Sequence, residues 1–204
     1  MCTSPMRFEP LAPIEYQPGY VLRHPTLTLN LLALAVSVIS LPLLGVITWE
    51  LHGGVSALPI EVTLTFLDIP VALIAAIFTI VFHELIHTAV LRSFGYRVSY
   101  GIAWRLLVAY AAAFRQLQRR DHALVTAVTP LALITVIALP LLATSSQYIV
   151  MFAFSVLLTN TAGAVSDMYL AWQLLRLPRQ TLLYDVDTTH MIIFVPTCSS
   201  RRGG

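Results

Sequence analysis

Four long apolar segments restrict this chain to a helical fold embedded in a membrane. They cover residues 27–49, 69–91, 123–143 and 148–175. A helix of about 20 apolar residues is long enough to cross the hydrocarbon core of a bilayer. Of the 204 residues, 57% are hydrophobic and 11% are charged, whereas soluble domains carry about 25% charged residues. We therefore predict an all-α membrane protein with four transmembrane helices.

Prolines lie in the interior of two of these segments: Pro42 in the first, and Pro130 and Pro140 in the third. Prolines are tolerated in membrane helices, which they usually kink. We assign these prolines no chemical role.

The basic residues predict the orientation of the chain. All twelve are arginines, and they lie before the first apolar segment, between the second and the third, and after the fourth. Residues 50–68 and 144–147 contain none. Basic residues accumulate in cytoplasmic loops, so this alternation predicts an integral membrane protein with an even number of spans and both termini in the cytoplasm.

The spans divide the chain into three parts. We expect a cytoplasmic N-terminal segment at 1–26, a four-span membrane domain at 27–176 and a cytoplasmic C-terminal tail at 177–204. Residues 50–68 predict an external loop with a short strand at 60–66. In the tail, apolar runs at 181–184 and 190–195 predict two short strands around an Asp-Thr-Thr turn.

Two short apolar stretches follow the second span, at 98–104 and 107–111, with Arg105 between them. Both are too short to cross a bilayer. We predict a short β-hairpin or re-entrant segment at the inner membrane surface, and an interfacial helix is the competing interpretation.

One polar motif, His83-Glu84-Leu85-Ile86-His87, interrupts the second apolar segment. On a helix, residues four apart lie on one face, so both histidines can reach one zinc ion. Glu84 then lies beside that ion as a base for a water molecule. A chance match, with the polar groups bonded to neighbouring helices, is the competing interpretation. A carboxylate near mid-membrane costs roughly 2.5–3.5 kcal/mol, which favours the zinc site.

A catalytic zinc usually takes three protein ligands and leaves a fourth position for water. Outside the motif, Asp167 is the acidic residue that lies well inside a span. If the fourth span runs inward, Asp167 and His87 fall at similar depth in the cytoplasmic half. We therefore predict His83, His87 and Asp167 as metal ligands and Glu84 as the catalytic residue. The alternative for Asp167 is a helix-end aspartate bonded to nearby polar groups.

Three further residues are candidates for binding substrate or supporting the site. Asn160 precedes Asp167 by two turns and shares its helical face, although ordinary interhelical hydrogen bonding explains it equally well. Gly163 would let a helix or a substrate approach closely, and packing alone explains it as well. Gly101 lies in the apolar hairpin.

The remaining histidines carry less information. Three of them lie near the ends of spans, and we expect them at the surface or the interface: His24, His52 and His122. In the tail, a second group of metal-ligand residue types consists of Asp185, Asp187 and His190. A turn capped by aspartate side chains is the better interpretation of that group.

Together these features resemble the site-2 protease group of intramembrane zinc metalloproteases. The resemblance covers roughly residues 69–176 and rests on the motif at 83–87, on Phe94-Gly95-Tyr96 with the hairpin after it, and on residues 160–167. More narrowly, the chain is similar to a small four-span branch, bacterial and archaeal, described as "putative zincin peptidases". Site-2 proteases carry an Asn-x-x-Pro pattern before the third ligand and a glycine after it, whereas this chain has Gly163 and Met168 there.

The resemblance implies zinc-dependent hydrolysis of a peptide bond within or next to a prokaryotic cell membrane, with Zn²⁺ as cofactor and Glu84 as general base. It implies a membrane-protein or membrane-peptide substrate in the lipid bilayer and no nucleic acid. One alternative is a non-proteolytic membrane protein that retains the zinc site as a structural or regulatory element. Another is an ion or metal transporter. A di-iron hydroxylase would need clustered histidines, and the six here are scattered.

Overall fold

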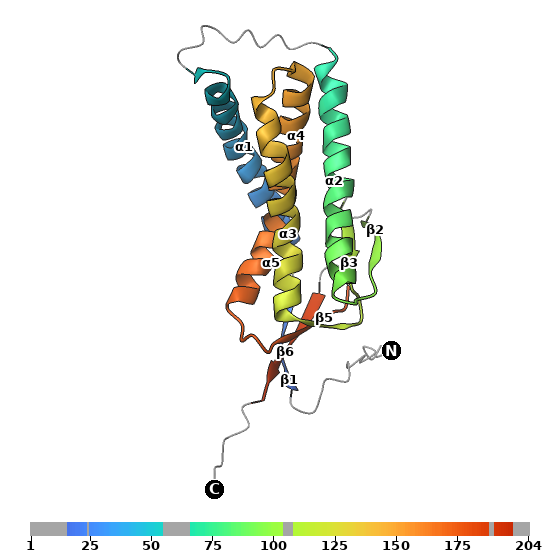
Figure 1. The fold of residues 1–204 in the computed structure, drawn as a ribbon. Helices are drawn as coiled ribbons and strands as arrows, with labels where there is room; N and C mark the ends of the chain where they lie inside the picture. The colour runs from blue at the N-terminus through green and yellow to red at the C-terminus, as the bar shows by residue number, and fades with distance from the viewer. Residues whose placement is uncertain (1–15, 24, 55–65, 104–107, 188–189, 198–204) are drawn as a thin grey trace, which may run out of the picture.

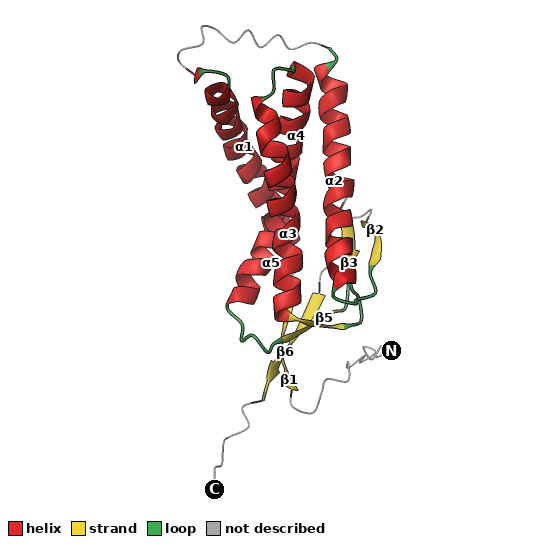
Figure 2. Cartoon of the chain, in the orientation of Figure 1, coloured by secondary structure: helices red, strands yellow, loops and turns green. Residues whose placement is uncertain are grey.

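The computed structural model describes residues 16–23, 25–54, 66–103, 108–187 and 190–197. Long helices form a bundle, and antiparallel strands gather at one end of it (Figures 1 and 2). The helices are α1 (Thr26–Leu51), α2 (Asp68–Ser93), α3 (Arg120–Ala138), the 3-10 helix η2 (Leu139–Ala143), α4 (Gln147–Gly163) and α5 (Val165–Leu175). The strands are β1 (Tyr16–Arg23), β2 (Ser99–Ala103), β3 (Val108–Ala112), β4 (Leu117–Arg119), β5 (Leu182–Asp185) and β6 (His190–Pro196).

Among the described residues, three helical stretches are long and apolar enough to cross a membrane: α1, α2, and α3 continued by η2. They coincide with the first three predicted spans. The fourth, predicted as one stretch at 148–175, is two helices, α4 and α5, which are bent by 43° where they meet. The pair supplies a fourth span when it is counted as one broken crossing.

The apolar side chains divide into an inner and an outer set. Large residues such as Val38 on α1 and Ile77 on α2 point outward and are each 64% exposed. Inside, α2, η2 and α4 meet around small and branched residues that include Ala75, Ala153 and the fully buried Leu142. Small residues let helices approach closely in a bilayer, and an apolar exterior suits lipid. Both the outward-facing and the inward-facing side chains of the bundle therefore have the composition typical of a membrane domain.

Strands β2 and β3 pair antiparallel, with Gly101 opposite Tyr110, and β3 contacts α2. The predicted hairpin after the second span is thus confirmed, and the interfacial helix is wrong for these residues. The hairpin lies beside the half of α2 that carries the histidines (Figure 1).

A second, four-stranded sheet has the order β1-β6-β5-β4, with every neighbouring pair antiparallel. Strands β5 and β6 confirm the two strands predicted in the tail. Strands β1 and β4 were not predicted, so a description with strands in the hairpin and the tail alone leaves out two members of this sheet. The strand predicted at 60–66 falls outside the described residues, apart from its last one.

A small apolar cluster fastens this sheet to the helices. It combines Leu22 of β1, Leu183 of β5 and Ile193 of β6 with Ala123 of α3 and Leu174 of α5. The sheet therefore holds the start of α3 and the end of α5 together at one end of the bundle. The ends of the described chain, in β1 and β6, lie at this same end (Figure 1).

Candidate metal centre

The two motif histidines lie one turn apart on the inner face of α2. Both are buried, His83 at 7% exposure and His87 at 8%. Their ring centroids are 4.8 Å apart and the rings are inclined by 72°. The four-residue spacing thus places both imidazoles on the same side of the helix, as the sequence predicts.

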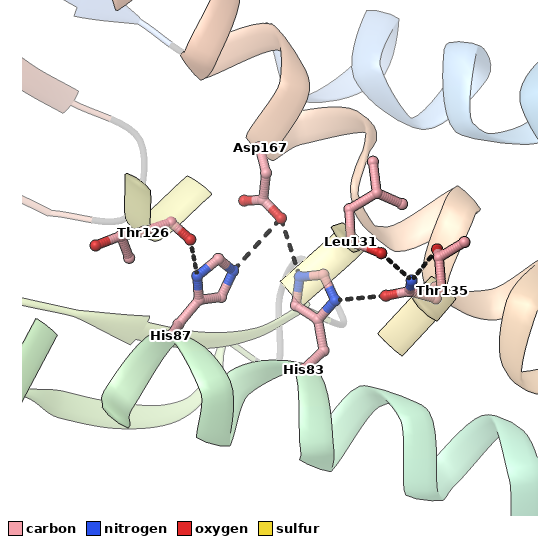
Figure 3. Close-up of polar contacts among 7 residues, drawn as sticks. His83, His87, Thr126, Leu131, Thr135 and Asp167 are labelled. Atoms are coloured by element: carbon pink, nitrogen blue, oxygen red, sulfur yellow. Dashed lines mark hydrogen bonds and ion pairs between the residues drawn. The ribbon is translucent and has the colours of Figure 1, made fainter. Parts of the chain in front are cut away.

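Asp167 reaches the same point from another helix. The break between α4 and α5 starts a new helix at Val165, and Asp167 lies in its first turn. An acidic side chain is favourable there because a helix N-terminus carries a partial positive charge. The Oδ2 atom of Asp167 lies 3.0 Å from Nε2 of His83 and 3.4 Å from Nε2 of His87 (Figure 3). The structure therefore brings together the three residues predicted as metal ligands.

Glu84 completes the local group of candidate donors. It is half-buried, and one of its carboxylate oxygens lies within 4.8 Å of a ring nitrogen of each histidine. His83, Glu84 and His87 thus form a cluster that could hold a metal ion. A carboxylate at this distance can also exchange a proton with a molecule held between the three predicted ligands.

The second nitrogen of each histidine ring, Nδ1, faces an oxygen acceptor. Nδ1 of His83 faces Oδ1 of Asn160 at 3.1 Å, and Nδ1 of His87 faces the main-chain carbonyl of Thr126 at 3.0 Å (Figure 3). Asn160 is itself fixed, because its Nδ2 donates to the Leu131 carbonyl at 3.3 Å and to Thr135 Oγ1 at 3.5 Å. These contacts orient the Asn160 amide so that its oxygen faces His83.

The pattern of donors and acceptors fits a metal cation. All four ring nitrogens of His83 and His87 face oxygen atoms, but two neutral imidazoles carry only two N–H hydrogens between them. If Nδ1 carries the hydrogen in each ring, both Nε2 lone pairs face the Asp167 carboxylate. Doubly protonated rings would instead place two cations beside a single carboxylate in the apolar bundle. A divalent cation removes the conflict, since it accepts both lone pairs and the carboxylate oxygen.

Two of the three separations among the predicted ligand atoms are compatible with zinc. Ligand atoms about 2.0–2.1 Å from a tetrahedral zinc ion lie about 3.3 Å from one another. The separations from Asp167 Oδ2, 3.0 and 3.4 Å, bracket that value.

The other sequence candidates lie elsewhere. A Cβ atom added at Gly163 would meet nothing within 4 Å, so the close approach predicted there is not made by the described residues. Gly101 is in β2, in the hairpin beside α2. Asn160 contacts His83 as described above and also links α4 to α3. Its role in binding substrate or supporting the site stays a prediction.

Three polar groups outside the centre have structural partners. His122 stacks on Phe94, with ring centroids 4.0 Å apart, and its Nδ1 lies 2.9 Å from the Tyr96 hydroxyl. The two ring nitrogens of His52 face the carbonyls of Thr48 and Thr144. In the tail, Asp187 accepts a hydrogen bond from the His190 backbone at 2.9 Å, as expected for a turn capped by an aspartate.

Comparison with known proteins identifies the family. A family model described as "Putative zincin peptidase" matches residues 76–182, just over half of the chain. The chain belongs to this family. The matched region contains the histidine motif, Asn160 and Asp167, and a zincin peptidase family implies zinc as the metal. No curated protein and no solved structure matches the chain.

Proposed function

We propose that the protein is a zinc-dependent peptidase of the site-2 protease type, which cleaves peptide bonds within or next to the membrane. Membership of the zincin peptidase family and the cluster of His83, Glu84 and His87 support zinc peptidase activity. The observation that carries the proposal is the convergence of two imidazoles and the Asp167 carboxylate, with a separate acceptor behind each imidazole. Three such ligands are typical of a catalytic zinc site with an open fourth position.

Each residue has a distinct role in this proposal. His83, His87 and Asp167 hold the ion. When bound, zinc lowers the pKa of a water molecule and polarises the scissile carbonyl. Glu84 accepts a proton from the attacking water and returns it to the leaving amine, so its carboxylate ends the cycle as it began. The acceptors behind the two imidazoles keep both rings oriented through the reaction.

The proposed substrate is a transmembrane segment that unwinds locally, because an intact helix keeps its carbonyls in its own hydrogen bonds. The histidines lie in the C-terminal half of α2, nearer to the end of the bundle that carries the sheet. If both termini are cytoplasmic, as the arginines favour, water reaches the centre from the cytoplasm. The β2–β3 hairpin beside α2 offers a strand edge on which an unwound substrate can pair.

The substitution Glu84→Gln tests the catalytic role. We expect the variant to bind zinc like the wild type but to cleave a synthetic transmembrane peptide in liposomes about 10²–10⁴-fold more slowly, because general-base catalysis contributes that much. Glu50→Gln is the matched control, since Glu50 lies at the far end of α1, close to Gly54. It should cleave at the wild-type rate.

Two results would count against the proposal. Undiminished cleavage by Glu84→Gln would show that another group moves the proton. A wild-type protein that binds zinc and cleaves no membrane peptide would favour the alternative, a non-proteolytic membrane protein that retains the metal site.

A further inference from the structure

Pro130 lies inside α3 and its side chain is fully buried. In an α-helix the carbonyl of residue i accepts a hydrogen bond from the N–H of residue i+4. Proline has no N–H, and its ring presses against the carbonyl four residues earlier. In α3 that carbonyl belongs to Thr126, which consequently has no helix donor at residue 130.

The Thr126 carbonyl is the group that faces His87. Its oxygen lies 3.0 Å from Nδ1 of His87, and both residues are buried (Figure 3). A buried carbonyl left without a partner costs about 1–3 kcal/mol, and the imidazole N–H removes that cost. The hydrogen is then on Nδ1, so Nε2 presents its lone pair towards Asp167 and His83.

The two histidines are held by different chemical groups. His83 has a side-chain acceptor, Asn160, which α3 fixes through the Leu131 carbonyl and Thr135. His87 has a main-chain acceptor supplied by α3 itself. A main-chain carbonyl within a helix normally accepts a hydrogen bond from the N–H of residue i+4. It is fully available to a side chain of another helix only where that N–H is missing.

We propose that Pro130 is a positioning residue of the metal centre. It removes the N–H that would otherwise compete for the Thr126 carbonyl, and that carbonyl then fixes the Nδ1–H tautomer of His87. The inference rests on the proposed zinc site and concerns the affinity for the metal, whether or not the protein cleaves peptides. The sequence predicts only a kink at Pro130, whereas this inference gives the residue a role in the metal centre.

The substitution Pro130→Ala restores the missing N–H and tests the inference. We expect the dissociation constant for zinc, measured on the full-length protein against a chromophoric chelator, to rise about tenfold, since losing such supporting partners typically costs 10–100-fold. In metal-free, mildly alkaline samples, ¹⁵N NMR of the histidines should show that His87 changes from the Nδ1–H tautomer to a mixture of both tautomers.

A second variant separates the missing N–H from the proline ring. Lactic acid at position 130, introduced by nonsense suppression, has the methyl group of alanine but an ester oxygen in place of the N–H. We expect it to restore wild-type zinc affinity and the Nδ1–H tautomer. Pro42→Ala is the control, because the carbonyl four residues before Pro42 belongs to Val38, whose side chain is 64% exposed.

The results discriminate clearly. Wild-type affinity and tautomer in Pro130→Ala would overturn the inference, and so would equal losses in the alanine and lactic acid variants, which would indicate ring packing alone. A wild-type protein that binds zinc without cleaving peptides would overturn the proposed function and leave the inference on Pro130 intact. The tautomer is read without metal, so it tests the inference even if zinc binding itself fails.

Discussion

Single atoms decide whether His83 and His87 can act as ligands. Nδ1 of each ring faces an oxygen that accepts its hydrogen, and this leaves both Nε2 atoms turned towards Asp167. The two acceptors differ in how far they can be inferred from sequence. Asn160 was a candidate because it shares a face with Asp167, whereas a main-chain carbonyl such as that of Thr126 has no sequence signature of its own. Only the proline four residues later indicates it.

Asp185, in the sheet, gives a prediction at the same scale. Burial raises the pKa of Asp185 from its usual 3.8 to about 6, against a hydrogen bond from Gln118 that lowers it. The folded protein therefore holds this proton more tightly than the unfolded chain. Because unfolding releases the proton between these two pKa values, the free energy of unfolding falls as pH rises from about 4 to about 6 and then levels off.

The substitution Asp185→Asn removes this titration while keeping an oxygen for Gln118. Above pH 6 we expect the variant to be more stable than the wild type by about 1–3 kcal/mol, and near pH 4 the two should be equal. Chemical unfolding of both proteins across this pH range measures the difference. A stability difference that does not change with pH would show that the pKa of Asp185 is not raised in the folded protein.

Among the elements, the broken α4–α5 pair matters most for the centre. The 43° bend at Ala164 places a helix N-terminus beside the two histidines, and Asp167 lies in that first turn. A continuous fourth helix, as the hydropathy of residues 148–175 predicts, would carry Asp167 at the same depth but in mid-helix. The break adds the favourable helix dipole.

Arg120, at the start of α3, donates hydrogen bonds to the C-terminal end of α5. Its side chain is buried; Nε donates to the Leu174 carbonyl at 2.8 Å and Nη2 to the Leu175 carbonyl at 3.4 Å. We expect Arg120→Ala to destabilise the protein by about 2–3 kcal/mol, because hydrogen bonds from charged donors are worth about 1.5–3 kcal/mol. In thermal unfolding this is a drop in Tm of about 4–12 °C.

The neighbouring arginine supplies the control for this substitution. Arg119 is exposed, so Arg119→Ala should change stability by no more than about 0.5 kcal/mol. Equal effects of the two substitutions would contradict the role given to Arg120, since they would show that charge at the start of α3 matters and the contact with α5 does not.

Local sequence predicts some of these helices and strands and misses others. Hydrophobic runs predict α1, α2 and α3 to within three residues at each start, because about 20 apolar residues are a local signal. Strand β1 escapes prediction because its partner, β6, lies at the other end of the chain. The α4–α5 break escapes prediction because neither Gly163 nor Ala164 interrupts the apolar run strongly enough to end a helix.

In the whole molecule, the sheet and the bundle hold the centre in place together. The four-stranded sheet joins both ends of the described chain and packs on the start of α3 and the end of α5. These two helices carry Thr126 and Asp167, while α2 carries the histidines. We propose that this end of the bundle lies in the cytoplasm, which the alternation of arginines favours, and that the substrate is a membrane protein. The likeness to zincin peptidases, inferred first from the motif and Asp167, is confirmed at the level of the family.

X-ray absorption spectroscopy of the zinc-loaded protein tests the central claim most directly. We predict one zinc per chain with two imidazole nitrogens at about 2.0–2.1 Å and carboxylate oxygen at about 2.0–2.2 Å, and in Asp167→Ala a lost carboxylate ligand with weaker binding. A spectrum without imidazole scattering, or one that is unchanged in Asp167→Ala, would contradict a zinc centre built from His83, His87 and Asp167.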